Sequence, residues 1–233
     1  MRGRGSLGIF IRECRKNFVQ TGALAPSSRA LAHAMAAYVS PGDAPRRILE
    51  VGPGTGVFTE EIVRRMGPFD HLDVYEINPV FADHIEDRFR HDPLFEIARG
   101  RLTLHRIDVL KLPRDVMYDL ILSGLPLNNF KPTEVRALME AFMYHLVPGG
   151  ILSYYEYLLV RTVKRCLSGA AERERLRLVG EITDEFIQRF QVRSDPVLLN
   201  LPPAVARHLV KPVANVHPAL RPSPALRPAA AVQ

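Results

Sequence analysis

Residues 48–59 have the clearest chemical character in this chain of 233 residues. Their sequence, ILEVGPGTGVFT, is a short apolar run followed by a glycine at every second position, Gly52, Gly54 and Gly56. Glycine lets the backbone adopt positive φ and approach a ligand closely, and the N–H groups at the start of a following helix are ready to bind that ligand. The pattern predicts a buried strand, a tight turn and a helix over residues 58–66 that together hold a cofactor.

Glu50 lies just before these glycines, which is an unusual place for an acid because the end of the strand is expected to be buried. A carboxylate there would repel a pyrophosphate and attract a cation such as an ammonium group. The pattern E-x-G-x-G-x-G also differs from the dinucleotide-binding pattern G-x-G-x-x-G. We therefore expect a cofactor that carries a positive charge.

Two more acids follow the next two expected strands. Glu76 stands 20 residues after Gly56, a spacing at which an acid accepts both hydroxyls of a ribose and disfavours a 2′-phosphate. Asp108 is placed to accept the amino group of an adenine held between Ile77 and Val109. An ammonium group, a ribose and an adenine together describe S-adenosylmethionine. The expected cofactor-binding residues are Glu50, Gly52, Gly54, Thr55, Gly56, Glu76, Ile77, Asp108, Val109 and Ser123.

The elements that must position these residues alternate along the chain. Further strands are expected at 71–76, 102–107, 118–122, 151–157, 190–194 and 204–209, and further helices at 28–38, 79–89, 133–146 and 170–189. This alternation predicts a parallel sheet with helices on both faces, whose ligands bind beyond the carboxyl ends of the strands. Thr133 is expected to cap one of the helices, and residues 148–150 to form a turn.

Each candidate residue also has an ordinary structural explanation. The glycines alone make a tight strand-to-helix turn, Glu76 alone is a solvated strand end, and Asp108 alone caps a helix. The cofactor interpretation is favoured because the glycines, both acids and the segment 123–129 all fall at carboxyl ends of predicted strands.

Composition indicates a globular domain with basic ends. Hydrophobic and charged residues make up 47% and 24% of the chain, and the formal net charge is +6. Cys14 and Cys166 lack metal-ligand spacing, so we expect reduced thiols and no metal. We see no run of 18 apolar residues and no secretory signal. Residues 1–40 hold six basic residues and one acid, whereas residues 197–233 hold four basic residues and no acid, which points to an anionic partner or to solubility alone.

The two ends of the chain differ in pattern. Residues 1–20 have apolar side chains at helical spacing with basic residues between them, which predicts a basic amphipathic helix. Such a helix docks on anionic lipid or packs its apolar stripe on the domain. The expected docking residues are Phe10, Arg12, Arg15, Lys16 and Phe18. Residues 21–211 are expected to form the folded domain, and residues 212–233, rich in proline and alanine, a disordered tail.

The segment EVGPGTG, with Glu76 and Asp108 behind it, resembles the class I S-adenosylmethionine-dependent methyltransferases. The resemblance covers about residues 20–210. It implies an α/β fold, namely a Rossmann-like, doubly wound, mostly parallel sheet of seven strands whose last strand is antiparallel. It also implies S-adenosylmethionine as the cofactor.

The segments QTGALAPSSRALAHAM, SGLPLNNF and NLPPA resemble the bacterial phospholipid N-methyltransferases, which methylate phosphatidylethanolamine, and relatives that methylate ornithine lipids. The resemblance implies a cytoplasmic enzyme held peripherally on the inner face of the cytoplasmic membrane. Its partners would be an anionic lipid surface and a lipid amine. We expect a monomer in solution. The loop expected to face the acceptor contains Leu125, Pro126, Asn128 and Asn129, and its two asparagines depart from the family pattern.

Three other functions remain open. The rRNA adenine dimethyltransferases share the first motif, but they carry N-[LI]-P-[FY] after the fourth strand, where the aromatic residue stacks the flipped adenine. Here Leu127 takes that place, and we expect no sizeable folded RNA-binding domain in the residues after 210. A nucleic-acid substrate is therefore not expected. A small-molecule methyltransferase and a non-catalytic cofactor binder are the remaining alternatives.

Methyl transfer to an amine needs the neutral amine, because an ammonium group with a pKa near about 10.4 cannot attack. Tyr155 and Tyr157 lie on one face of the fifth expected strand, and they are our candidates to orient the amine by hydrogen bonds and cation–π contact. Aromatic packing explains them equally well. His33 and His105 are weaker candidates.

Overall fold

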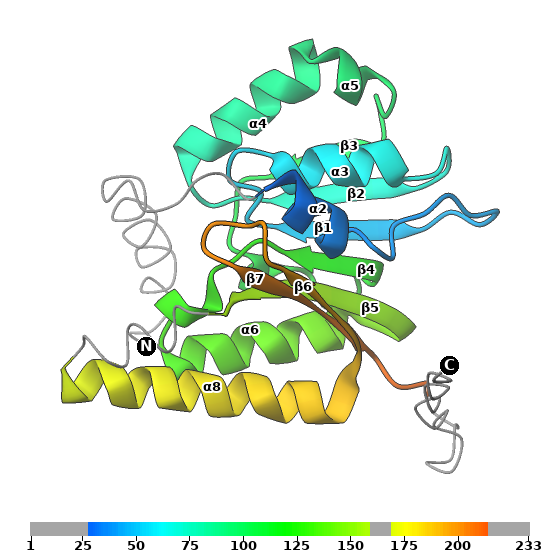
Figure 1. The fold of residues 1–233 in the computed structure, drawn as a ribbon. Helices are drawn as coiled ribbons and strands as arrows, with labels where there is room; N and C mark the ends of the chain where they lie inside the picture. The colour runs from blue at the N-terminus through cyan, green and yellow to red at the C-terminus, as the bar shows by residue number, and fades with distance from the viewer. Residues whose placement is uncertain (1–27, 159–168, 214–233) are drawn as a thin grey trace, which may run out of the picture.

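A computed structural model describes residues 28–158 and 169–213, which fold around one seven-stranded sheet (Figure 1). The strand order is β3-β2-β1-β4-β5-β7-β6, and β7 runs antiparallel to both of its neighbours. The strands are β1 Arg47–Val51, β2 His71–Tyr75, β3 Leu102–His105, β4 Tyr118–Ser123, β5 Leu146–Tyr157, β6 Gln191–Val197 and β7 Ala204–Val210. The predicted doubly wound α/β fold is confirmed. Its strand order reverses between β1 and β4, the place where such sheets bind ligands.

Helices cover both faces of the sheet. In Figure 1, α2 and α3 lie on one face, α6 and α8 lie on the other, and α4 and α5 lie toward the β3 edge. The helices are α2 Arg29–Met35, α3 Val57–Arg65, α4 Pro79–His91, α5 Pro93–Glu96, α6 Pro132–His145 and α8 Ala170–Phe190, with 3-10 turns η1 Val109–Lys111 and η2 Leu127–Asn129.

The alternation of side chains along each strand divides the core into two layers. Leu49 of β1 packs in one cluster with Phe142 of α6, whereas Ile48 packs in the other with Ile62 of α3. Successive strand residues point to opposite faces, and a parallel sheet covered on both sides needs apolar residues at both. This is why the strands read as nearly continuous apolar runs.

The element bounds correct several expectations. Thr133 does not cap α6, because Pro132 already occupies the first turn and Lys131 is the N-cap, with the Glu134 carboxylate accepting the Lys131 N–H at 2.9 Å. Residues 148–150 lie within β5 instead of forming a separate turn. There Gly149 donates its N–H to Lys211 at 2.8 Å. The first described helix ends at Met35 instead of residue 38, and the short α5 was not predicted.

Two predicted segments lie wholly or almost wholly outside the described residues. The amphipathic helix over residues 1–20, with Phe10, Arg12, Arg15, Lys16 and Phe18, is one of them. The other is the tail over residues 212–233, of which only Pro212 and Val213 are described. Both remain predictions. Among the described residues, every helix is too short or too polar to cross a bilayer.

A buried carboxylate joins four neighbouring strands, β3, β2, β1 and β4. Asp73 of β2 is 2% exposed, and it accepts hydrogen bonds from Arg47 at 2.7 Å, His105 at 2.8 Å and Tyr118 at 3.1 Å, which lie on β1, β3 and β4. Burial opposes ionisation of Asp73, but the hydrogen bonds from His105 and Arg47 outweigh it and hold its pKa below the ordinary value of 3.8. Asp73 therefore stabilises the fold as a carboxylate.

We predict that Asp73→Asn lowers the free energy of unfolding by about 2–3 kcal/mol at pH 7, since it removes the charge from a buried, hydrogen-bonded pair. The pKa is lower in the folded state, so the contribution is present above pH 3.8 and is lost as pH falls through the folded pKa. Urea denaturation from pH 7 down to about pH 2 measures this. The exposed Asp115→Asn is the control, with an expected change within about 0.5 kcal/mol. Equal effects of the two substitutions would contradict the assignment.

Candidate cofactor and acceptor site

The glycine turn lies at the carboxyl end of β1 and leads directly into α3. Gly52, Gly54 and Gly56 have φ of 70°, 59° and 85°, a region that other residues rarely adopt. A Cβ at Gly56 would lie 2.9 Å from the side chains of Ile85 and Arg88. The turn thus needs its glycines for backbone conformation and, at Gly56, for space. The predicted strand, turn and helix are confirmed.

Two buried carboxylates lie at the same edge of the sheet. Glu50 is 0% exposed near the end of β1, and Glu76 is 2% exposed just beyond β2, the neighbouring strand. The Glu76 carboxylate accepts the Asn78 N–H at 2.9 Å, which fixes it at the start of α4. Burying two acids in one region favours a cationic, hydrogen-bonding ligand. These residues fit the ammonium and ribose groups of S-adenosylmethionine.

The third predicted acid has a structural role that the structure shows directly. Asp108 accepts the Leu110 N–H at 3.0 Å and caps η1. This is the helix-capping role that we named as the structural alternative to cofactor binding. Val109 is 5% exposed in the core, and Ile77 is half-buried and packs on the same cluster. All three lie at the carboxyl ends of β2 and β3. Their contact with an adenine stays a prediction.

The glycine turn is in direct contact with the loop that follows β4. Gly124 donates its N–H to the Val51 carbonyl at 2.8 Å, and a Cβ at Gly124 would lie 2.5 Å from the Gly52 carbonyl oxygen. No side chain fits between these two backbones. We did not select Gly124 from the sequence. Its position between Ser123 and Leu125 at a strand end was the only indication.

The loop over residues 124–130 is mostly inward-facing, although we expected it to face the acceptor. Leu125 and Leu127 are both 3% exposed and pack in the core. Asn128 is buried, while Pro126 and Asn129 are half-buried. The adjoining Ser123 is fully buried at the end of β4, and its hydroxyl accepts the Leu125 N–H at 3.4 Å. The rim of this loop is therefore formed by Pro126 and Asn129.

The side chain of Arg175, on α8, binds the backbone of this loop. Its guanidinium donates to the carbonyls of Asn128, at 2.8 Å, and Phe130, and a salt bridge of 2.7 Å to Glu172 orients it. Sequence patterns could not find this residue, because Arg175 lies in a charged helix 47 positions from Asn128. We infer that Arg175 positions the loop.

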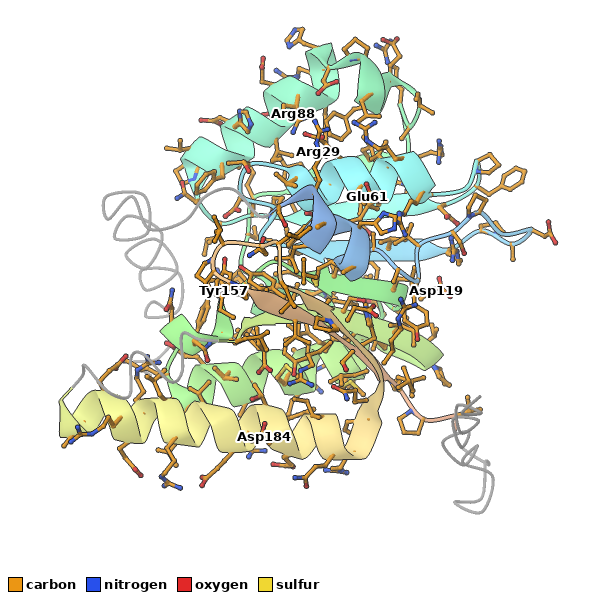
Figure 2. The ribbon with its side chains drawn as sticks, viewed as in Figure 1. Arg29, Glu61, Arg88, Asp119, Tyr157 and Asp184 are labelled. Atoms are coloured by element: carbon orange, nitrogen blue, oxygen red, sulfur yellow. The ribbon has the colours of Figure 1, made fainter. Side chains whose placement is uncertain are left out.

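The two candidate tyrosines lie together, as strand alternation predicted. The rings of Tyr155 and Tyr157 are 5.2 Å apart, and Tyr155 packs on Phe58 of α3 at 5.9 Å. Figure 2 shows Tyr157 at the carboxyl end of β5. Burial, together with Tyr155, raises the pKa of Tyr157, so its phenol stays protonated at neutral pH and is suited to hydrogen bonding and not to acting as a base. Their catalytic role stays a prediction.

The two histidines considered from the sequence have other partners. His105 donates to Asp73 at 2.8 Å and stacks on Tyr75. His33 is exposed on α2 and lies 3.2 Å from Glu61. Neither histidine is directed into the glycine turn by these contacts. Among the described residues, no group of three or more His, Cys, Asp or Glu side chains is arranged to hold a metal ion.

We predict that Gly124→Ala weakens S-adenosylmethionine binding about tenfold, because its methyl group must displace the Gly52 carbonyl and so distort the turn. Isothermal titration calorimetry measures the affinity. Gly42→Ala is the matched control, since a Cβ there meets nothing within 4 Å. Unchanged affinity in Gly124→Ala would show that the turn and the loop move independently.

Comparison with known sequences agrees with this geometry. Residues 48–150 match the family described as a methyltransferase domain. The chain is 28% identical over 142 residues to an ornithine lipid N-methyltransferase of Singulisphaera acidiphila, covering 61% of this chain and 73% of that protein. It is 31% identical over 106 residues to ribosomal RNA small subunit methyltransferase A of Yersinia enterocolitica, covering 46% of this chain but 33% of that protein. The chain thus spans only about a third of the length of that rRNA enzyme.

Solved structures show the same architecture. The N-methyltransferase NodS from Bradyrhizobium japonicum WM9 superposes with a TM-score of 0.58 at 17% identity, covering 79% of this chain and 94% of that one. Its complex with S-adenosyl-L-homocysteine gives a TM-score of 0.56, also at 17% identity, and covers 79% of this chain and 86% of that one. These likenesses concern the fold. Residues 48–150 thus form a methyltransferase domain, and the glycine turn and strand order give it the architecture expected of the class I S-adenosylmethionine-dependent methyltransferases.

Proposed function

We propose that this enzyme methylates the amine of a membrane lipid head group, in ornithine lipid or phosphatidylethanolamine. The observation that carries the proposal is Leu127, which is 3% exposed and packed in the core at the place where rRNA adenine dimethyltransferases have a stacking aromatic residue. Base stacking is a main source of affinity for an extruded base. The similarity to an ornithine lipid N-methyltransferase over 73% of that protein supports a lipid amine.

The chemistry requires alignment and removal of a proton. S-adenosylmethionine supplies an electrophilic methyl group on a sulfonium ion. The neutral acceptor nitrogen would receive this methyl group through its lone pair, and the methylated amine would have to lose a proton before any further transfer. Glu50 and Glu76 would bind the ammonium and the ribose. The apolar Leu125 and Leu127 beneath the loop lower the local polarity, which favours the neutral amine.

Tyr155 and Tyr157 would orient the acceptor from the α3 face of β5. Because the pKa of Tyr157 is raised, its hydroxyl donates a hydrogen bond across the physiological range. The two rings meet edge to face, and their faces also suit a quaternising nitrogen through cation–π attraction. Within this proposal the enzyme is monomeric and acts at the inner face of the cytoplasmic membrane. It would dock through the predicted helix over residues 1–20.

Lipid analysis tests the substrate directly. The chain is produced in a bacterium that makes phosphatidylethanolamine and in one that makes ornithine lipid, and total lipids are analysed by mass spectrometry. We expect one of these lipids to gain methyl groups. Glu76→Ala, which removes the carboxylate proposed to bind the ribose hydroxyls, is the inactive control. Purified protein is also incubated with labelled S-adenosylmethionine and ribosomal small subunits. Label in rRNA with no methylated lipid would overturn the proposal.

We predict that Arg175→Ala impairs methyl transfer to the lipid about tenfold while the affinity for S-adenosylmethionine is unchanged, because the loop loses two charge-assisted hydrogen bonds. Separate measurement of kcat and KM for the lipid and of the cofactor Kd distinguishes this from general damage. Arg175→Lys should restore part of the activity. Arg177→Ala is the control, because Arg177 lies two residues further along the same helix and is exposed. Equal kinetics for Arg175→Ala and Arg177→Ala would show that Arg175 has no positioning role.

A further inference from the structure

Three leucines project from the loop that joins β6 to β7. Leu198, Leu199 and Leu201 are 70%, 89% and 74% exposed. Single exposed leucines are ordinary in proteins, but three on one loop tip form an apolar patch that water solvates poorly. We call residues 198–203 the leucine loop.

The leucine loop is held in this outward arrangement by Asn200. Asn200 is 2% exposed, its side-chain oxygen accepts the Ser28 N–H at 2.9 Å, and its side-chain nitrogen donates to the Pro202 carbonyl at 2.7 Å. A polar residue is thus buried while the apolar residues beside it face solvent. This inversion of the usual preference indicates that the leucines are displayed for a partner.

The loop lies at the same edge of the sheet as the glycine turn. Val197 pairs with Ala204, and Ala204 pairs with Tyr157, so β6 and β5 end level with each other. Leu158 follows β5, donates its N–H to the Pro203 carbonyl at 2.8 Å and is itself 41% exposed. In Figure 1 the loop joining β6 to β7 lies on the side of the sheet opposite the described end of the chain.

A groove extends the apolar surface behind the loop. It has a volume of about 610 Å³ and lies between the leucine loop and α2. Leu198 and Leu199 line one side, and Ala30 and Ala34 line the other. The groove is also lined by His33, Arg65, Arg193 and Asp195, so apolar and charged side chains lie next to each other along the flank of the loop.

Two basic segments join the described fold at this loop. Residues 1–27 lead into Ser28, which bonds to Asn200, and they hold five basic residues and one acid. Residues 159–168 follow Leu158, which bonds to the loop, and they hold three basic residues and no acid. An apolar loop whose adjoining chain segments are rich in basic residues complements an anionic bilayer, which combines negative head groups with an apolar interior.

We propose that the leucine loop inserts into an anionic phospholipid bilayer and turns the carboxyl edge of the sheet toward it. The membrane contact is then built into the folded domain and is not confined to residues 1–20. This inference rests on the proposed lipid substrate. The orientation brings the loop over residues 124–130 to the membrane surface, where a head-group amine reaches it without leaving the bilayer.

The absence of tryptophan from the sequence allows a direct test. Leu199→Trp in the full chain places one fluorophore on the loop at a site of 89% exposure, and Ile97→Trp places one outside the loop at a site of 72% exposure. On addition of phosphatidylglycerol-containing vesicles, we expect a blue shift and quenching by brominated acyl chains for Leu199→Trp only. No spectral response of Leu199→Trp while the protein sediments with the vesicles would overturn the proposal.

A second pair of variants measures the contribution to binding. Leu199→Ser/Leu201→Ser should bind the same vesicles about tenfold more weakly, with unchanged Tm and S-adenosylmethionine affinity. Phe69→Ser/Ile97→Ser is the control, because these residues are 61% and 72% exposed elsewhere. A large fall in Tm for the leucine variant would mean that the chain itself covers the leucines. A change in its oligomeric state would mean that a second copy does. Either result overturns the proposal.

These outcomes separate the docking surface from the substrate. If the unmodified chain methylates lipid but the fluorescence of Leu199→Trp does not change on addition of vesicles, the docking proposal fails and the proposed function stands. If Leu199→Trp responds but no lipid is methylated, the docking surface stands and the proposed substrate fails.

Discussion

The backbone contact between Gly52 and Gly124 is the constraint on which the candidate site depends. These residues follow β1 and β4, the two neighbouring strands between which the order of the sheet reverses. Crossover connections leave in opposite directions at this point, so a crevice opens above it. The contact closes the bottom of that crevice with two backbones and no side chain. The glycine turn and the loop over residues 124–130 therefore share one backbone contact, and we expect a displacement of either to disturb the other.

Buried carboxylates occur in two different settings around this contact. Asp73 lies inside β2, where Arg47 and His105 compensate its charge, and it serves the fold. Glu50 and Glu76 are equally buried but lie at the carboxyl edge, where ligands of such sheets bind. Position along the strand thus separates the acid that stabilises the fold from the two acids that we propose bind the cofactor, although the degree of burial is similar.

The sequence was sufficient for local features and insufficient for contacts between distant segments. The glycine turn and the strands were predictable because apolar periodicity and glycine spacing are local. Gly124, Arg175 and Asn200 were not, because each acts on a segment far away in the chain, such as Ser28 for Asn200. The cap of α6 was misplaced for a local reason. Thr133 is a good cap by type, but the proline before it fits only the first helical turn, which moves the cap to Lys131.

The described chain ends at the amino edge of the sheet, opposite the glycine turn (Figure 1). There Val213 lies against Gly149, and Lys211 bonds to the carbonyls of Tyr144 and Leu146. An affinity tag attached beyond Val213 would anchor the domain at the amino edge of its sheet. Immobilised in this way on a sensor chip, the protein would present its cofactor crevice and the leucine loop to the flowing solution. Attachment before Ser28 would instead press that same edge against the support.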